Sequence, residues 1–187
     1  ARILDRRRPS APAQAVSPVA ESPAELAYNP PTTHPAMTRR GFDRMPIDGD
    51  FQVEVCDWAN EIDREGLLDV REGVFVLEQH VPRDMEIDDD DPRSVHVLAR
   101  AQDGTSVGSG RLTPDGSIGR VAVLRTWRGR GVGTMLLHTL LDQARTRRLT
   151  TISIHAQRDA VPFWLRHGFA SVGEEFEEAG IPHIMMQ

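Results

Sequence analysis

The sequence predicts a mixed α/β domain built around a single sheet. Short runs in which apolar and polar residues alternate are typical of half-buried strands, and they begin at residue 51. Turns containing Asp-Gly join the runs in the first half of the domain, which indicates antiparallel hairpins. A strand–glycine turn–helix–strand unit over residues 117–154 places one pair of strands in parallel. The expected sheet is therefore mostly antiparallel, with helices flanking it.

The first half of the domain starts with the strand FQVEVCDW, from residue 51. The apolar spacings of residues 57–81 fit a helix best, either one helix or two helices broken near Gly66. An acidic loop, PRDMEIDDDDPRS, separates this helical region from the strands VHVLARA and SVGSGRLTP, which the turn DGT connects.

The second half begins with the strand SIGRVAVLRTW, which leads into a glycine-rich segment. The amphipathic helix TMLLHTLLDQARTRRL follows, with Met135, Leu136, Leu140 and Leu141 expected to face inward. TTISIHAQ predicts a buried strand, and DAVPFWLRHGF predicts a short helix closed by Gly168. The remaining residues, ASVGEEFEEAGIPHIMMQ, predict a strand, a loop and a last strand.

Composition excludes several classes of protein. The chain has 187 residues, 39% hydrophobic and 27% charged, and no apolar stretch approaches the roughly 20 residues of a membrane span. The single cysteine, Cys56, excludes an intramolecular disulfide and a cysteine-based zinc cluster, and we expect no bound metal and a cytoplasmic protein. The formal net charge of −6 disfavours binding to nucleic acid. All 22 basic side chains are arginine, which suggests a bacterial source.

Residues 1–45 differ from the rest of the chain. They hold seven arginines against four acidic residues and are rich in Pro, Ala and Ser, without a sustained apolar period. Such a segment buries too little surface to offset the entropy lost on ordering it. We therefore expect a disordered or extended tail over 1–45, with a transit peptide as the alternative interpretation, and one domain over 46–187.

The segment TWRGRGVGTML places three glycines two residues apart, immediately before a helix. The first N–H groups of a helix lack partners within it and lie at the positive end of its dipole, so they bind phosphate where the backbone can be approached closely. Glycine permits that approach. The sequence therefore predicts a pyrophosphate cradle that opens a helix at about Gly133–Thr134, with Arg128 and Arg130 as cationic partners. A tight turn at a helix start is the alternative interpretation.

Two other phosphate-binding motifs do not fit this segment. The P-loop requires a lysine, and the chain contains none. The Rossmann fingerprint requires a different glycine spacing and a doubly wound sheet, which the upstream strand pattern does not provide.

Four further patterns stand in a fixed order along the chain. They are VFVLEQ (74–79), VAV followed by RGRGVG (121–133), QRDAVPFWLRHGF (157–169) and GIPH (180–183). Together they resemble the GNAT superfamily of N-acetyltransferases, and its ElaA-like branch in particular. RGRGVG is similar to the signature Arg/Gln-x-x-Gly-x-Gly/Ala, VAV to the bulged strand of that family, and the third pattern to Asn-x-x-Ala-x-x-Phe-Tyr-x-x-x-Gly-Phe. The resemblance covers about residues 51–187.

The resemblance implies a GNAT-like fold of the α/β (α+β) class, with a mixed, mostly antiparallel central sheet and splayed parallel strands at the cofactor site. It also implies acetyl-CoA as acyl donor, held by backbone N–H groups, with the N–H of Val123 donating to the thioester carbonyl as oxyanion stabilisation. The expected cofactor-binding residues are Val121, Ala122, Val123, Arg128, Gly129, Arg130, Gly131, Val132, Gly133, Thr134, Gln157, Phe163 and Trp164.

The implied reaction is direct attack of an amine on the thioester. A protonated amine has no lone pair, so a base must remove a proton, directly or through a water. Candidate bases are Glu78, His155, Glu86 and His96, of which Glu78 and His155 are the expected catalytic side chains.

The leaving thiolate lacks its usual proton donor. Trp164 stands where the family pattern has a tyrosine, and indole is not a usable acid. The chain has one tyrosine, Tyr28, and it lies in the tail. We therefore expect the thiolate to depart into solvent, or onto a water held by His155 or His167.

The acceptor is expected to be an amine of a small molecule or peptide. The acidic segments 84–91 and 174–178 can attract a cationic amine, although a solvated loop is the alternative interpretation of the first. A homodimer is compatible with the family. Two other functions stay open: a catalytically weak acyl-CoA-binding module, which Trp164 suggests, and a different nucleotide binder that uses the same helix end.

Overall fold

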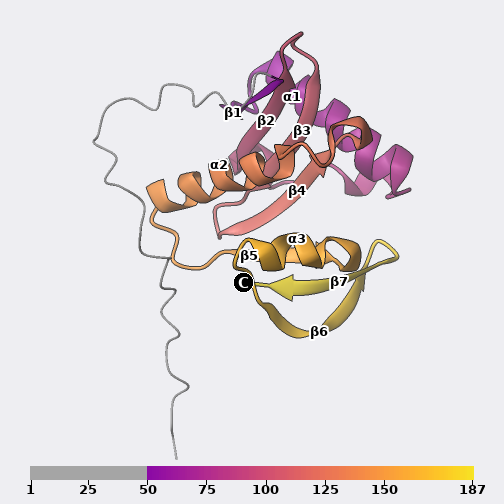
Figure 1. Cartoon of the computed structure of the whole chain (residues 1–187), viewed down its shortest axis with the longest axis vertical. Coiled ribbons are helices and arrows are strands. Elements are labelled where there is room, and N and C mark those ends of the chain that lie inside the picture. The colour runs from indigo at the N-terminus through magenta and orange to yellow at the C-terminus, as the bar shows by residue number, and fades with distance from the viewer. Residues whose placement is uncertain (1–49) are drawn as a thin grey trace, which may run out of the picture. The chain divides into compact units, whose positions relative to one another are not determined.

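Seven strands form one sheet in the order β1-β2-β3-β4-β5-β7-β6 (Figure 1). The computed structural model describes residues 50–187, so the predicted tail over 1–45 lies outside the described residues. The strands are β1 (Phe51–Cys56), β2 (Val95–Ala101), β3 (Ser106–Leu112), β4 (Ser117–Val123), β5 (Ser153–Gln157), β6 (Ser171–Glu178) and β7 (Ile181–Met186). The helices are α1 (Glu61–Arg71), the π-helix η1 (Glu72–Glu78), α2 (Val132–Thr146) and α3 (Val161–Arg166). Short 3-10 turns are η2 (Arg83–Met85), η3 (Asp91–Arg93), η4 (Arg125–Trp127) and η5 (Arg158–Ala160).

Every pair of neighbouring strands is antiparallel except β4 and β5, which run parallel. This confirms the predicted mixed sheet with one parallel pair. The helices α2 and α3 cover one face, toward the viewer in Figure 1, and α1 packs on the other. Two glycines of β3 let α2 approach closely, because a Cβ at Gly108 would lie 2.9 Å from Val132 Cγ1 and one at Gly110 would lie 2.9 Å from Leu140 Cδ1.

The helical region after β1 is continuous through Gly66, so of the two alternatives the helix without a break there is the one observed. Asn60 caps α1 by accepting from the N–H of Asp63 at 3.2 Å, and the helix runs on from residue 71 into η1. Gly66 faces the sheet, where a Cβ would lie 2.5 Å from Ser106 Oγ and 3.0 Å from Leu98 Cδ2. The glycine therefore permits close packing of a helix on the sheet, rather than ending the helix.

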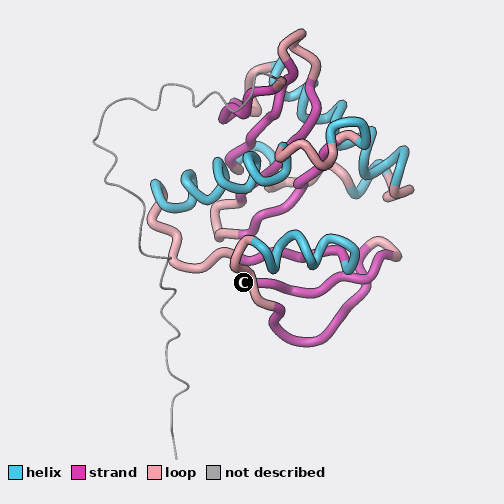
Figure 2. Tube along the Cα trace, viewed as in Figure 1, coloured by secondary structure: helices cyan, strands magenta, loops and turns pink. Residues whose placement is uncertain are grey.

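The parallel strands β4 and β5 pair only where they begin. Ser117 is opposite Ser153 and Ile118 is opposite Ile154, and the register extends no further. Beyond these pairs the sheet separates into the group β1–β4 and the group β5, β7 and β6, which Figure 2 shows as two sets of strands. In β4 the register against β3 shifts near Arg120, whose φ of +51° marks a bulge. The bulge thus lies directly before the segment 121–123, which the resemblance gives as the bulged strand.

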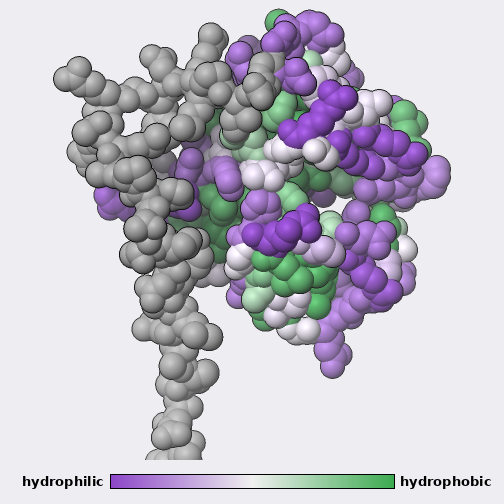
Figure 3. Space-filling view, in the orientation of Figure 1, coloured by the Kyte–Doolittle hydropathy of each residue, from purple (hydrophilic) through white to green (hydrophobic). Residues whose placement is uncertain are grey.

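Within residues 50–187, no helix combines the length and the apolar character that a membrane span requires. Hydrophobic and hydrophilic residues are interspersed on the face in Figure 3.

Candidate functional site

A cavity of about 320 Å³ opens where β4 and β5 diverge. Both strands contribute to its wall, β4 with Val121 and β5 with His155 and Gln157, and Trp164 of α3 closes part of it. The amide Nε2 of Gln157 donates to Gln79 Oε1 at 2.8 Å, which links β5 to the segment after η1. The structure therefore brings four of the predicted site residues to one cavity.

Val123 lies at the end of β4 with its peptide groups turned toward β5. The next residue, Leu124, donates its N–H to the Val107 carbonyl of β3 at 3.0 Å. Because successive N–H groups of a strand point to opposite edges, the N–H of Val123 is directed away from β3, to the side where β5 diverges. Ala122, also predicted for the site, is buried against α1 on the opposite face of the sheet.

The chain passes from β4 to α2 through a turn with an open backbone. Gly129 and Gly131 have φ of +75° and +83°, and no atom lies within 4 Å of a Cβ built at either position. Gly131 is the N-cap of α2, with no side-chain cap hydrogen bond and no acidic residue in the first turn. Nothing on α2 itself thus neutralises its positive end, which fits an anionic group such as a diphosphate. At Gly133 a Cβ would make ordinary contact with Phe163, 3.6 Å from Cε2.

The two arginines of the turn are already engaged. The guanidinium of Arg128 donates from Nε to the Val123 carbonyl at 2.9 Å, and its two terminal nitrogens bind Glu78. The Arg130 guanidinium lies 4.9 Å from the ring centroid of Trp127. Thr134, on the first turn of α2, has Oγ1 3.3 Å from His167 Nε2.

His155 has a carboxylate partner at the cavity. Its Nδ1 lies 3.0 Å from Glu178 Oε2, and both residues line the cavity. Glu178 ends β6, and the following turn, with positive φ at Ala179 (52°) and Gly180 (74°), brings β7 back beside it. The sequence placed Glu178 in an acidic segment but did not pair it with His155. Gly180 is the one residue of this turn that a hairpin favours, since the preceding Ala179 is not a residue that prefers positive φ.

The other predicted bases have different surroundings. Glu78 is not among the cavity-lining residues, and the hydrogen bonds from Arg128 hold the pKa of its carboxyl below its usual value. His96 is 1% exposed, with Nε2 2.8 Å from the Asp91 carbonyl, and burial lowers the pKa of its imidazole. Glu86 lines the cavity but is buried in an ion pair with Arg71.

Part of the acidic loop is buried and bound by arginines. It is therefore neither a fully solvated loop nor a set of unpaired carboxylates free to attract an amine. Asp91 is fully buried, and Arg71 and Arg111 each donate to its Oδ1 at 2.9 Å. Burial raises the pKa of Asp91, but the hydrogen bonds from Arg71 and the other donors outweigh it, so the net pKa is lowered. Asp88 receives Arg111 at 2.6 and 2.9 Å and Arg120 at 3.1 Å. Three arginines from α1, β3 and β4 therefore hold this loop against the sheet.

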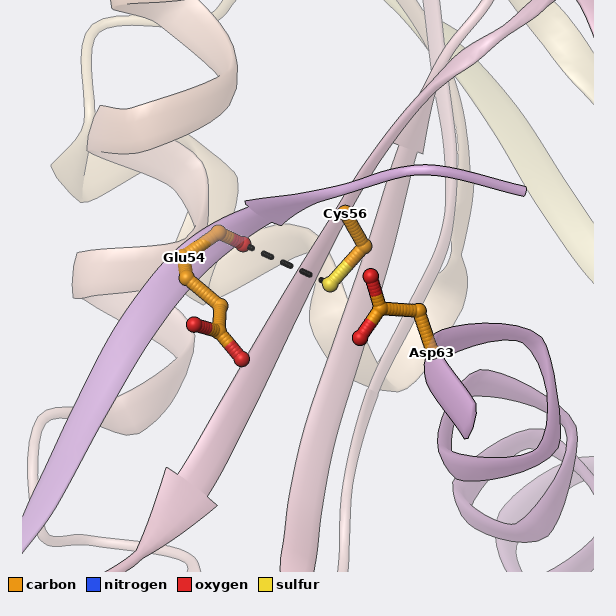
Figure 4. A group of neighbouring side chains, drawn as sticks. All are labelled: Glu54, Cys56 and Asp63. Atoms are coloured by element: carbon orange, nitrogen blue, oxygen red, sulfur yellow. Dashed lines mark hydrogen bonds between the residues drawn. The ribbon is translucent and has the colours of Figure 1, made fainter. Parts of the chain in front are cut away.

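A second cluster of potential ligand atoms lies away from the cavity, on β1 and α1. Glu54, Cys56 and Asp63 bring one such atom each to within 4.8 Å of one another (Figure 4). Arg100 donates to Glu54 at 2.8 Å and to Asp63 at 2.9 Å, so both carboxylates are already engaged by one guanidinium. Burial, with the nearby carboxylates, raises the pKa of Cys56 to about 12, so the thiol stays protonated. The cluster is therefore a salt-bridged structural group and a poor metal site.

Comparisons with known proteins agree with this geometry. Residues 58–187 match the family model described as acetyltransferase (GNAT) domain. The chain is 38% identical over 132 residues to the uncharacterized N-acetyltransferase YjcF of Bacillus subtilis, covering 68% of this chain and 93% of that protein.

Two crystal structures share the fold and a substantial part of the sequence. An acyl-CoA N-acyltransferase from Pseudomonas aeruginosa is 31% identical, with a TM-score of 0.65 over 73% of this chain and 97% of that chain. ElaA from Escherichia coli is 30% identical, with a TM-score of 0.64 over 73% and 97% of the two chains.

Proposed function

Because this chain belongs to the GNAT acetyltransferase family, we propose that it transfers an acetyl group from acetyl-CoA to an amine of a small molecule or peptide. One observation carries the proposal: β4 separates from β5 and leads directly into the uncapped N-terminus of α2. The cavity for the reacting groups thus lies along β4, and the chain that leaves this strand forms, after η4, the cradle for an anionic carrier.

The donor side of the reaction depends on backbone groups. Acetyl-CoA supplies an activated thioester, and the N–H groups from Arg128 to Thr134 would hold its diphosphate. The N–H of Val123 faces the gap and would stabilise negative charge on the carbonyl oxygen, because a preorganised dipole needs no reorganisation as the charge develops.

The acceptor side favours His155 over Glu78 as the general base. Hydrogen bonding of Nδ1 to Glu178 orients the imidazole and leaves Nε2 to receive a proton from the ammonium group of the acceptor. The neutral amine then attacks the thioester carbon and gives a tetrahedral oxyanion. As this intermediate collapses, the carbon–sulfur bond breaks, its electron pair leaves with sulfur, and the nitrogen loses its second proton to water. The thiolate takes its proton from water, since Trp164 offers only an indole N–H at the cavity.

Thiol release tests this function. The chain is incubated with acetyl-CoA and a panel of primary amines, and free CoA thiol is measured together with acetylated product. Amine-dependent release supports the proposal. Tight binding of CoA without release identifies the acyl-CoA-binding module instead, and displacement of CoA by equimolar ADP identifies a general nucleotide binder.

The base is tested separately. His155→Gln is expected to lower kcat by about 10²- to 10⁴-fold and to remove the acidic limb of the pH profile, while the Kd of CoA stays unchanged. Glu178→Gln keeps an acceptor for Nδ1–H and is expected to give a smaller loss. A His155→Gln variant with a normal profile would contradict the assignment.

A further inference from the structure

We infer that the acceptor is a cationic amine without a carboxylate beside it, an inference that rests on the proposed function. The charges of the cavity wall carry this conclusion. Glu86, Asp88 and Glu178 supply three carboxylates, against the two guanidiniums of Arg111 and Arg120. The question is whether either guanidinium is free to bind an anionic acceptor.

Arg120 donates to the loop that forms one wall from two of its three guanidinium nitrogens. Its Nε donates to the Glu86 carbonyl at 3.2 Å, and its Nη2 donates to the Met85 carbonyl and to Asp88, each at 3.1 Å. A carboxylate that approached the remaining nitrogen, Nη1, would meet the carboxylate of Asp88, which already pairs with Nη2.

The same loop holds Arg111 more completely. Both terminal nitrogens bind Asp88, and one also binds Asp91. Its Nε is the one buried side-chain polar atom without a partner among residues 50–187, but that atom has less than 1 Å² of accessible surface. A ligand in the cavity therefore cannot reach it.

The accessible charge of the wall is negative. The side chains of Glu178 and Asp88 are 46% and 36% exposed, whereas those of Arg120 and Arg111 are 23% and 8% exposed. Oε2 of Glu178 is hydrogen-bonded to the imidazole of His155. An incoming ammonium group therefore finds a carboxylate next to the proposed base, which favours delivery of a cation to that point.

A carboxylate on the carbon that bears the amine adds a repulsion that opposes the attraction of the ammonium group to this wall. It would lie near Glu178 or Asp88, where each guanidinium already pairs with a carboxylate of the loop, and like charges in close contact disfavour binding. We expect kcat/KM for an amine to exceed that for the corresponding amino acid on the order of 10- to 100-fold.

Matched acceptors test this inference. Phenethylamine, phenylalaninamide and phenylalanine share the aromatic body, and tryptamine and tryptophan form a second pair. With the full chain and acetyl-CoA, thiol release is expected to be fast with the amines and the amide and slow with the amino acids. The amide separates the effect of charge from that of bulk. Equal kcat/KM for phenethylamine and phenylalanine overturns the inference and leaves the proposed function intact, whereas no release with any amine overturns both.

A pair of variants identifies the carboxylate responsible. Glu178→Gln is expected to lower the ratio of kcat/KM for phenethylamine to that for phenylalanine at least about threefold, and the ratio cancels any loss of catalysis common to both acceptors. Glu174→Gln is the matched control, because Glu174 lies on the same strand but does not line the cavity. A ratio that stays unchanged in Glu178→Gln overturns the inference, as does an equal fall in Glu174→Gln.

Discussion

Glu78 and Arg128 form a bidentate ion pair, with Nη1–Oε1 and Nη2–Oε2 distances of 2.8 Å each. The same guanidinium donates from Nε to the carbonyl of Val123. One side chain thus ties the end of η1 to the end of β4, beside the turn that opens α2. Since the pair keeps the Glu78 carboxylate ionised and engaged, we expect Glu78 to position the strand end rather than to accept a proton.

Glu78→Gln distinguishes these two roles. Glutamine retains an oxygen for Arg128, so kcat is expected to fall less than about tenfold, against the 10²–10⁴ that loss of a general base costs. The pH dependence of kcat/KM is the measurement, and its acidic limb is expected to stay in place. Glu72→Gln, on the same π-helix but paired with Arg83, is the control. A loss above 100-fold with a flattened acidic limb would restore Glu78 as the base.

Gly131→Ala is expected to weaken CoA binding at least tenfold. The residue has φ of +83°, so alanine costs on the order of 1 kcal/mol of backbone strain and adds a methyl group to the cradle. Gly104→Ala, in the turn between β2 and β3 with φ of +87° and open space around it, imposes the same strain away from the cradle. Calorimetric titration with CoA and urea unfolding are measured on both variants. Equal CoA affinity in the two variants would show that the methyl group at Gly131 does not meet the ligand.

Asp91→Asn is expected to lower the free energy of unfolding by about 3–5 kcal/mol at neutral pH, because it removes the buried negative charge that the guanidiniums of Arg71 and Arg111 share. The lowered pKa of Asp91 means that its stabilising contribution is complete above the unfolded value of 3.8 and is lost as the pH falls below it. The difference from the unaltered chain should therefore shrink at about pH 3. Urea unfolding at both pH values measures it. Asp90→Asn, whose ion pair with Arg93 is exposed, should change stability by less than about 1 kcal/mol.

Gly66→Ala is expected to destabilise the fold by about 1–3 kcal/mol, although alanine is the better helix former. The added methyl group meets Ser106 Oγ at 2.5 Å and Leu98 Cδ2 at 3.0 Å. Thermal unfolding measures the loss, and Gly66→Ala combined with Ser106→Ala should recover part of it. A stabilised Gly66→Ala variant would mean that α1 does not pack this closely on the sheet.

Local patterns in the sequence predict much of this fold. The turns containing Asp-Gly and the alternating runs indicate the hairpins, and the glycine turn with the helix after it indicates the one parallel pair. Each of these features depends on residues that are close together in the chain, so a short stretch of sequence is enough to predict it. Gly66 is the exception. A glycine is needed there because the helix packs closely on strands that come 30 to 40 residues later in the chain.

The electrostatics of the site could not be predicted in the same way. The acidic loop has the composition of a solvated segment, and its arginine partners stand far apart at Arg71, Arg111 and Arg120. Only the folded sheet brings them to one place, as it brings Glu178 to His155. Long-range pairing of this kind leaves no periodic signal in a single sequence.

The divergence of β4 from β5 determines which extended chains can pair with the exposed strand edges. An unpaired strand normally attracts another strand from outside, with aggregation as the result. Here the two unpaired edges face each other in the interior of one sheet, closed at one end by the pairing of Ile118 with Ile154. The unpaired backbone groups are thus open to a slender chain of amide groups that enters between the two strands, and less open to the edge strand of a neighbouring protein.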